Sequence, residues 1–178
     1  CLEYTQGMEQ YEPPAVIYCG PGWEPWTPEQ IDGKGLGGSE TAVVRLAEEM
    51  VKRGLRVMVY AEAEGTWNGV NYRKYDKWNP HMPIYKFVSW RQPAVFDQTI
   101  QAEHKVLWMH DTDSGPLLTE ERAKKIDSVW VMSRWHRSHM LQTYGFLKDD
   151  QMVVIGNGID PERFDGEETR ENAVIYSS

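Results

Sequence analysis

The sequence predicts an α/β fold, a doubly wound and mainly parallel sheet of the Rossmann-like kind, on three observations. A strand, a helix and a second strand follow one another over residues 15–60, which is the βαβ pattern. The apolar runs near residues 107, 130 and 154 lack alternation, as expected for strands covered on both faces. The 178 residues suffice for one domain with a well-buried core.

The first βαβ unit has clear boundaries. The run AVIYC (15–19) predicts a buried strand that ends at a Gly-Pro-Gly turn. Ser39 is the predicted N-cap of the following helix, with Glu40 placed favourably in the first turn of its dipole. Gly54 predicts the C′ stop, and LRVMVY (55–60) predicts the second strand. Apolar residues recur between these ends at helical spacing: Val43, Leu46, Ala47, Met50 and Val51.

The remaining elements are expected in alternation, which favours the doubly wound arrangement. Residues 21–38 form a long loop, and loops of that length in compact domains are usually functional or mobile. Ser133 is placed to cap the last predicted helix. Further strands are expected at 70–75, 84–89, 105–109, 128–132 and 152–155, and helices near 93–103, 117–126 and 134–145.

Composition excludes several classes of function. The net charge of −8 argues against a nucleic-acid-binding role, because such proteins normally present a basic face. No apolar run approaches the length of a transmembrane helix, and no signal peptide is recognisable. With only Cys1 and Cys19 there is no disulfide framework, so we expect a reducing, cytoplasmic environment.

The glycine-rich segment GKGLGGSE (33–40) is the most informative stretch of the chain. Four glycines leave the backbone open to close approach by a ligand. The N-terminus of the helix that follows offers unpaired N–H groups and a positive dipole end, which suit phosphate. The segment therefore predicts a site for a diphosphate-bearing ligand. The alternative without a ligand is a flexible loop that connects the strand to a capped helix.

An NAD(P)-dependent oxidoreductase is a rival interpretation of the same segment. Gly33, Gly35 and Gly38 fit the G-x-G-x-x-G spacing, and Glu62 follows at about the distance of the ribose-binding acid. That fingerprint requires its first glycine directly after the first strand, whereas residues 20–32 intervene here. We therefore rank this interpretation below the one that follows.

Three ordered segments resemble retaining glycosyltransferases of the GT-B fold, family 4. They are GLGGSETAVVRLAEEMVKRGLRVMVY (35–60), KVLWMHD (105–111), and DSVWVMSRWHRSHM with VVIGNGIDPERF (127–164). ENAVIYSS (171–178) is similar to the strand that opens the second domain of that family. The resemblance covers about residues 15–178, and its specificity lies in the order of the motifs.

The resemblance implies an acceptor-side domain over residues 15–170, after an N-terminal arm at 1–14. Residues 171–178 would begin a C-terminal donor domain that is otherwise missing. The implied reaction moves a hexosyl unit from a nucleoside diphosphate sugar to an acceptor hydroxyl with retention and needs no metal or other cofactor. The catalytic Glu-x7-Glu segment belongs to the missing half, so this chain is expected to be inactive alone.

Residue roles follow from the same resemblance. Gly37, Gly38 and Ser39 would lie near the donor diphosphate, and His110 would contact the donor sugar. Asp111 would be a ligand of an acceptor hydroxyl. Asn157 and Gly158 would lie near the interdomain hinge, although a tight turn after the last strand explains this pair equally well.

Other candidates rest on position and chemistry. Trp90 and Arg91 follow a predicted strand. There an indole can stack on a sugar, and a guanidinium can donate two hydrogen bonds to oxygens. Ser133 and Arg134 open a helix that points to the ligand edge of the sheet. Asp111-Thr112-Asp113 spells the D-x-D of metal-dependent transferases, but nothing else of that class accompanies it, and we expect no metal there. His136 and His139 lack a third zinc ligand nearby in the sequence.

A third class of function stays open. The chain can also be interpreted as a non-catalytic sugar- or partner-binding domain of Rossmann-like fold, because the residues that would prove transfer chemistry lie outside it.

Overall fold

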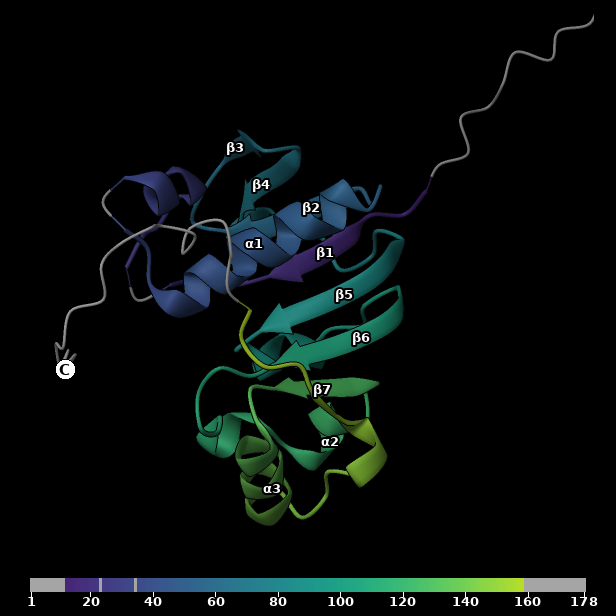
Figure 1. The fold of residues 1–178 in the computed structure, drawn as a ribbon. Coiled ribbons are helices and arrows are strands. Elements are labelled where there is room, and N and C mark those ends of the chain that lie inside the picture. Colours follow the sequence, from purple (N-terminus) through teal and green to yellow (C-terminus); the bar gives the residue numbers. More distant parts are fainter. Residues whose placement is uncertain (1–11, 23, 34, 159–178) are drawn as a thin grey trace, which may run out of the picture.

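The structure is a computed structural model that describes residues 12–22, 24–33 and 35–158. Within these residues, eight strands form one sheet in the order β3-β4-β2-β1-β5-β6-β7-β8 (Figure 1). Every neighbouring pair is parallel except the β3–β4 hairpin. The strands are β1 Ala15–Tyr18, β2 Val57–Ala61, β3 Gly65–Trp67, β4 Val70–Lys74, β5 Ile84–Trp90, β6 Ala102–Trp108, β7 Ser128–Val131 and β8 Met152–Val154. The α-helices are α1 Gly38–Lys52, α2 Glu120–Ala123 and α3 Arg134–Thr143. The predicted α/β, Rossmann-like, mainly parallel sheet is thus confirmed.

The strand order places a switch point at the centre of the sheet. From β1 the chain first builds outward through β2 and β4, then returns to the other side of β1 with β5 and continues to β8. In open α/β sheets ligands bind outside the carboxyl ends of the strands, at such a point. Here that point lies between the ends of β1 and β5.

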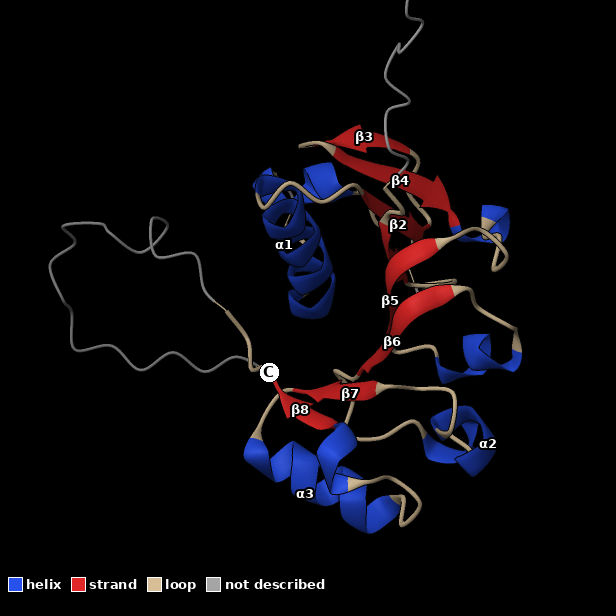
Figure 2. Cartoon of the chain, turned by 90° about the vertical axis from the view of Figure 1, so that its right-hand side faces the viewer, coloured by secondary structure: helices blue, strands red, loops and turns tan. Residues whose placement is uncertain are grey.

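Helices cover both faces of the sheet (Figure 2). α1 packs on one face over a core that includes Ile17, Val59 and Val88. α2 and α3 pack on the other face over a core that includes Val16, Leu107 and Val129. Neighbouring residues of β1 therefore enter opposite cores, and Val16 and Ile17 are both fully buried. This explains why the strands read as continuous apolar runs.

The ends of α1 show one correction and one confirmation. Ser39 was expected to be the N-cap, but the helix begins at Gly38 and its N-cap is Gly37. The glycine loop therefore continues into the first turn, and Ser39 is already helical. Gly54 ends the helix as predicted: its φ is +85°, and its N–H donates to the Val51 carbonyl at 2.9 Å. The N–H of Leu55 reaches the Met50 carbonyl at 3.1 Å, which completes a Schellman motif.

The helix predicted at 93–103 is wrong. Only a 3₁₀ helix forms, at Pro93–Asp97, and β6 begins at Ala102 because that residue pairs with Ile84 of β5. The helix predicted at 117–126 is reduced to a 3₁₀ turn at Gly115–Leu117 and the short α2. Strand pairing and proline-initiated turns decided these segments over local periodicity. The short strand β3 was not predicted.

The other predicted elements are present within a few residues of their expected ends. Ser133 caps α3 as predicted, since its Oγ accepts from the His136 N–H at 3.0 Å. Additional 3₁₀ helices span Pro28–Asp32, Tyr75–Lys77 and Asp149–Gln151. Most of the predicted arm at 1–14 and the strand predicted at 171–178 lie outside the described residues. No helix in the described ranges is long and apolar enough to cross a membrane.

Candidate functional site

Three tryptophans lie in register across the carboxyl ends of neighbouring strands. Trp90 of β5 pairs with Trp108 of β6, and Trp108 pairs with Trp130 of β7. All three side chains belong to, or pack against, the core on the α1 side of the sheet. Trp90 and Trp108 are buried, at 4% and 3% exposure, whereas Trp130 is partly exposed. Parallel pairing thus gathers residues that are far apart in sequence into one aromatic row at the ligand edge.

His110 packs against this row. Its ring centroid lies 4.7 Å from that of Trp108 and 6.1 Å from that of Trp90. Its Nε2 is buried and has no hydrogen-bond partner among the residues that the structure describes. Burial first, and then the Arg91 charge, lower the pKa of His110 to about 4 against the smaller opposing effects of Asp111 and Glu40. The imidazole is therefore neutral near pH 7, with one nitrogen available to a ligand.

Arg91 and Asp111 form a bidentate pair beside His110. The Arg91 Nε donates to Asp111 Oδ2 at 2.6 Å, and its second guanidinium nitrogen donates to Oδ1 at 2.7 Å. The guanidinium carbon also lies 5.0 Å from the Trp90 ring centroid. Arg91 has a backbone φ of +62°, a conformation that residues other than glycine rarely adopt. Both residues were predicted to meet a ligand; here each is engaged with the other at the surface.

The glycine loop meets the same edge of the sheet through the first turn of α1. Gly37 and Gly38 are exposed, and Ser39 Oγ donates to Glu40 Oε2 at 3.3 Å. The Glu40 charge raises the pKa of His110 and, after the larger effect of burial, that of Cys19. His110 and Cys19 follow β6 and β1, so the Glu40 charge acts at the carboxyl ends of these two strands. Glu40 was expected only to complement the helix dipole, so its position at the site is new.

α3 contributes a separate group of polar side chains. His136 is buried, and its Nδ1 accepts from the Met132 N–H at 3.3 Å. Burial lowers the pKa of His136, and backbone groups of Thr112 and Asp111 oppose that shift. Arg134, one residue after the cap, is exposed. The predicted pair Ser133 and Arg134 therefore lies at the same edge, but only Ser133 has a structural role that the geometry explains.

The two carboxylates of the D-x-D tripeptide have different partners. Asp111 pairs with Arg91, whereas Asp113 accepts from the Gly115 N–H at 2.8 Å and lies 3.7 Å from His139 Nε2. His139 in turn stacks on Trp135 with 5.2 Å between ring centroids. In the described part of the chain, no group of three or more His, Cys, Asp and Glu residues could hold a metal ion.

Asn157 and Gly158 lie beyond β8 in an exposed segment without regular structure. Gly156, just before them, has φ of +65°, so the chain turns there. The predicted hinge role stays a prediction.

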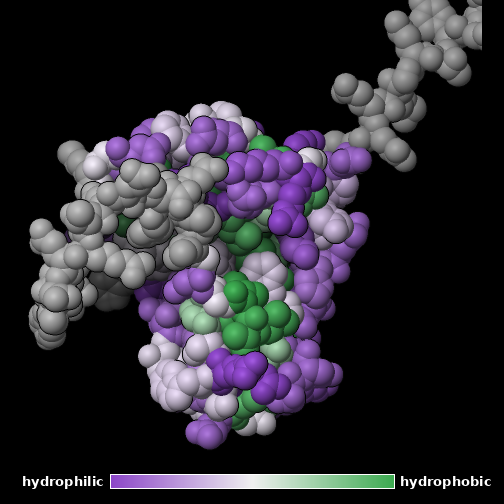
Figure 3. Space-filling model, viewed as in Figure 1, coloured by the Kyte–Doolittle hydropathy of each residue, from purple (hydrophilic) through white to green (hydrophobic). Residues whose placement is uncertain are grey.

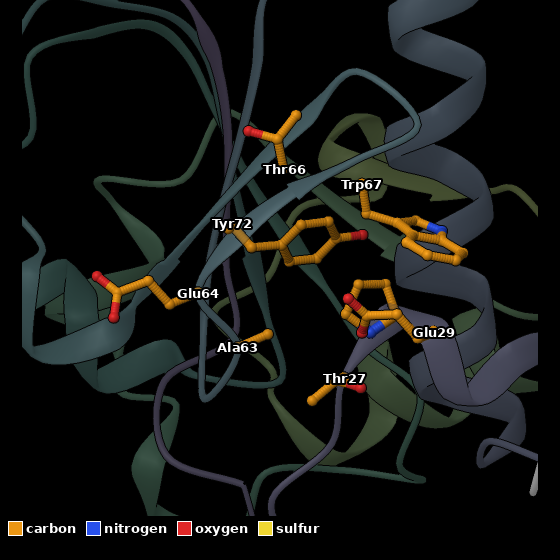
Figure 4. Close-up of a pocket in the computed structure, with 9 residues that line it drawn as sticks. Thr27, Glu29, Ala63, Glu64, Thr66, Trp67 and Tyr72 are labelled. Atoms are coloured by element: carbon orange, nitrogen blue, oxygen red, sulfur yellow. The ribbon is translucent and has the colours of Figure 1, made fainter.

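A small pocket lies at the edge of the sheet, where sequence reasoning found nothing. It encloses about 50 Å³ beside the β3–β4 hairpin and the 3₁₀ helix Pro28–Asp32 (Figure 4). Its walls include Thr27, Glu29, Trp67 and Tyr72. Strand β3 was not expected, so nothing in the sequence predicted that residues 27–29 and 63–72 come together.

The fold defines a Rossmann-like α/β domain, and the residues around Trp90, Trp108 and His110 give it an aromatic and polar edge at the carboxyl ends of the strands. A scan against protein-family models found no match, and a search of curated proteins found no significant match.

Proposed function

We propose that this chain is the acceptor-side, N-terminal domain of a retaining glycosyltransferase of the GT-B kind. Its reaction moves a hexosyl unit from a nucleoside diphosphate sugar to an acceptor hydroxyl. The observation that carries the proposal is His110: an imidazole held neutral just after the carboxyl end of β6, in contact with two tryptophans, with an unpaired Nε2 within the described residues.

The chemistry of His110 suits a sugar better than a phosphate. A neutral imidazole can donate to or accept from a hydroxyl, whereas it gives no charge attraction to an anion. The neighbouring indoles of Trp90 and Trp108 offer an apolar, aromatic flank. A sugar presents the same mixture of hydroxyls and apolar C–H faces.

The other predicted residues take supporting roles in this proposal. The amides of Gly37, Gly38 and Ser39 at the start of α1 would stabilise the leaving diphosphate. Asp111, which pairs with Arg91, would accept a hydrogen bond from the acceptor hydroxyl. The exposed Arg134 is available to an anionic group at the same edge. The donor-binding carboxylates would come from a second domain, so no transfer is expected from this chain alone.

The proposal is tested by NMR titration of the 178-residue chain. The His110 ring resonances and the Trp90 and Trp108 indole N–H signals are followed while UDP-glucose, GDP-mannose, UDP or NADH is added. We expect saturable shifts at these three residues with a sugar nucleotide, and loss of the shifts in His110→Ala. Shifts with NADH alone would reverse the choice of class, and shifts with free sugars but no nucleotide would favour a non-catalytic binding domain.

An NAD(P)-dependent oxidoreductase is the second candidate, and one observation favours it. Glu62 directly follows β2, where the ribose-binding acid of dinucleotide enzymes lies. Against it, residues 19–37, including a 3₁₀ helix, separate β1 from α1, so no glycine turn joins them directly. Glu62→Gln should abolish NADH binding under this candidate and leave sugar-nucleotide binding unchanged under the first.

A further inference from the structure

The pocket beside the β3–β4 hairpin contains a buried hydroxyl without a partner. The Tyr72 side chain is 2% exposed, and its hydroxyl has no hydrogen-bond partner in the described ranges of the chain. An edge-to-face contact with Trp26, at 6.5 Å between ring centroids, fixes its ring. A buried hydroxyl without a partner loses free energy on folding. A ligand in the pocket that hydrogen-bonds to it would recover that loss.

The surroundings of this hydroxyl are negatively charged. Burial raises the pKa of Tyr72 well above its usual range, and the carboxylates of Glu48 and Glu29 raise it further. Glu48 already accepts from Arg45 at 2.8 Å and from Asn68 at 2.7 Å, so its charge is compensated. Glu29 lies in the first turn of the 3₁₀ helix Pro28–Asp32 and lines the pocket.

Figure 4 separates the two carboxylates that line the pocket. The Glu29 side chain lies on the side of the pocket toward which the Tyr72 hydroxyl points. The Glu64 carboxylate points away from the other labelled side chains. The indole nitrogen of Trp67 lies on the far side of its ring from the Tyr72 hydroxyl. The described lining includes neither lysine nor arginine. A ligand group would thus meet one carboxylate, one phenol oxygen and an aromatic ring.

We propose that this pocket binds a primary ammonium group. The Glu29 carboxylate and the Tyr72 oxygen accept its hydrogen bonds, and the Trp67 ring forms an aromatic wall that favours a cation. One water needs about 10–15 Å³ of such space, so the 50 Å³ present admit a group of a few non-hydrogen atoms. The pocket is partly open, so the ammonium can be the end of a longer amine.

Methylammonium chloride is the probe for the test, with the Trp67 indole N–H as the NMR signal, assigned through Trp67→Phe. We expect a saturable shift of that signal with methylammonium. Glu29→Gln should weaken binding about tenfold or more, because a hydrogen bond to a charged group is lost. Tyr72→Phe should weaken it several-fold, whereas Glu64→Gln, the matched control, should leave binding unchanged.

Three outcomes would overturn the proposal. An equal shift with methanol would mean a site for neutral hydroxyl groups. An equal shift with sodium chloride would mean unspecific attraction of cations. Equal losses in Glu29→Gln and Glu64→Gln would mean diffuse negative charge instead of a built contact. The site is independent of the proposed transferase chemistry, because none of its probes or variants involves His110 or the start of α1.

Discussion

The Glu40 carboxylate occupies the place where a side chain on residue 37 would begin. Its Oε2 is the atom nearest to the position of a Cβ built on Gly37. Glu40 is the third residue of α1 and Gly37 its N-cap, so the carboxylate folds back over the start of its own helix. The positive end of the helix dipole is therefore already faced by an anion. Figure 3 shows an apolar patch on one face of the molecule. Among the described residues, the exposed apolar side chains of Val153, Val154 and Ile155 belong to or follow the edge strand β8.

Glu40→Gln should strengthen the binding of pyrophosphate to this chain. The substitution removes a negative charge that competes with the incoming anion, and we expect a gain of roughly fivefold or more at low salt. Isothermal titration calorimetry measures it. Glu49→Gln is the control, because Glu49 pairs with Lys52 at the other end of the same helix and should not alter the affinity. Equal affinity in Glu40→Gln and the parent chain would place the anion elsewhere.

Gly37→Ala and Gly38→Ala should change the stability of the fold in opposite directions. At Gly37 a methyl group meets the Glu40 carboxylate, which must swing away, and alanine is a poor N-cap, so we expect a loss of about 1 kcal/mol. At Gly38 a Cβ meets nothing within 4 Å among the described residues, and the position is helical, so alanine should stabilise by roughly 0.5–1 kcal/mol. Urea unfolding measures both. A stable Gly38→Ala variant that fails to bind a sugar nucleotide would support close approach of the ligand at that residue.

His110 should titrate with a pKa near 4, well below its ordinary value, because burial and Arg91 disfavour its charged form. The unfolded chain takes up that proton as the pH falls through about 6.5, whereas the folded chain does so only near 4. The contribution of His110 to the free energy of unfolding is thus fully present above pH 6.5, and it declines as the pH falls from 6.5 to 4. NMR titration of the ring protons checks the value, with His110→Asn to assign the signal. Glu40→Gln should lower the pKa further, and an ordinary value would contradict the burial of the ring.

Asn68→Asp should destabilise the fold through Glu48. The amide of Asn68 donates to the buried Glu48 carboxylate, which ties the β3–β4 turn to α1. An aspartate cannot donate and adds a like charge, so we expect a loss of about 2 kcal/mol near pH 7. The loss should shrink in acid, where protonation removes the repulsion. Thermal unfolding measures it. Asn71→Asp, which faces Arg73 at 3.0 Å, is the matched control and should be neutral or stabilising.

Cys19 should be unreactive toward thiol reagents in the folded chain. It is buried at 2% exposure, and burial followed by the Glu40 charge raises its pKa, so little thiolate forms. Alkylation with iodoacetamide in a Cys1→Ser background measures this residue alone. Labelling should appear only when urea unfolds the chain. Fast labelling of the native protein would mean that the switch point next to β1 opens to solvent.

Local chemistry in the sequence predicted the elements whose signals are local. The stop at Gly54 and the cap at Ser133 need only the residues around them, and both predictions are confirmed. The helix predicted at 93–103 was wrong because the pairing of Ala102 with Ile84 competes for the same residues, and pairing between distant segments leaves no local signal. The N-cap predicted at Ser39 was wrong because glycine at 37 can begin the helix earlier.

The sequence by itself determined the α/β class, because the apolar runs of buried strands and the 3.6-residue period of α1 are written along the chain. It also indicated which strand ends carry polar and aromatic side chains. Only the tertiary structure decided that Trp90, Trp108 and His110 meet, that Arg91 pairs with Asp111, and that Tyr72, with its buried hydroxyl, lines one pocket with Glu29. Strand register and burial set these contacts, and both depend on residues far away in the sequence.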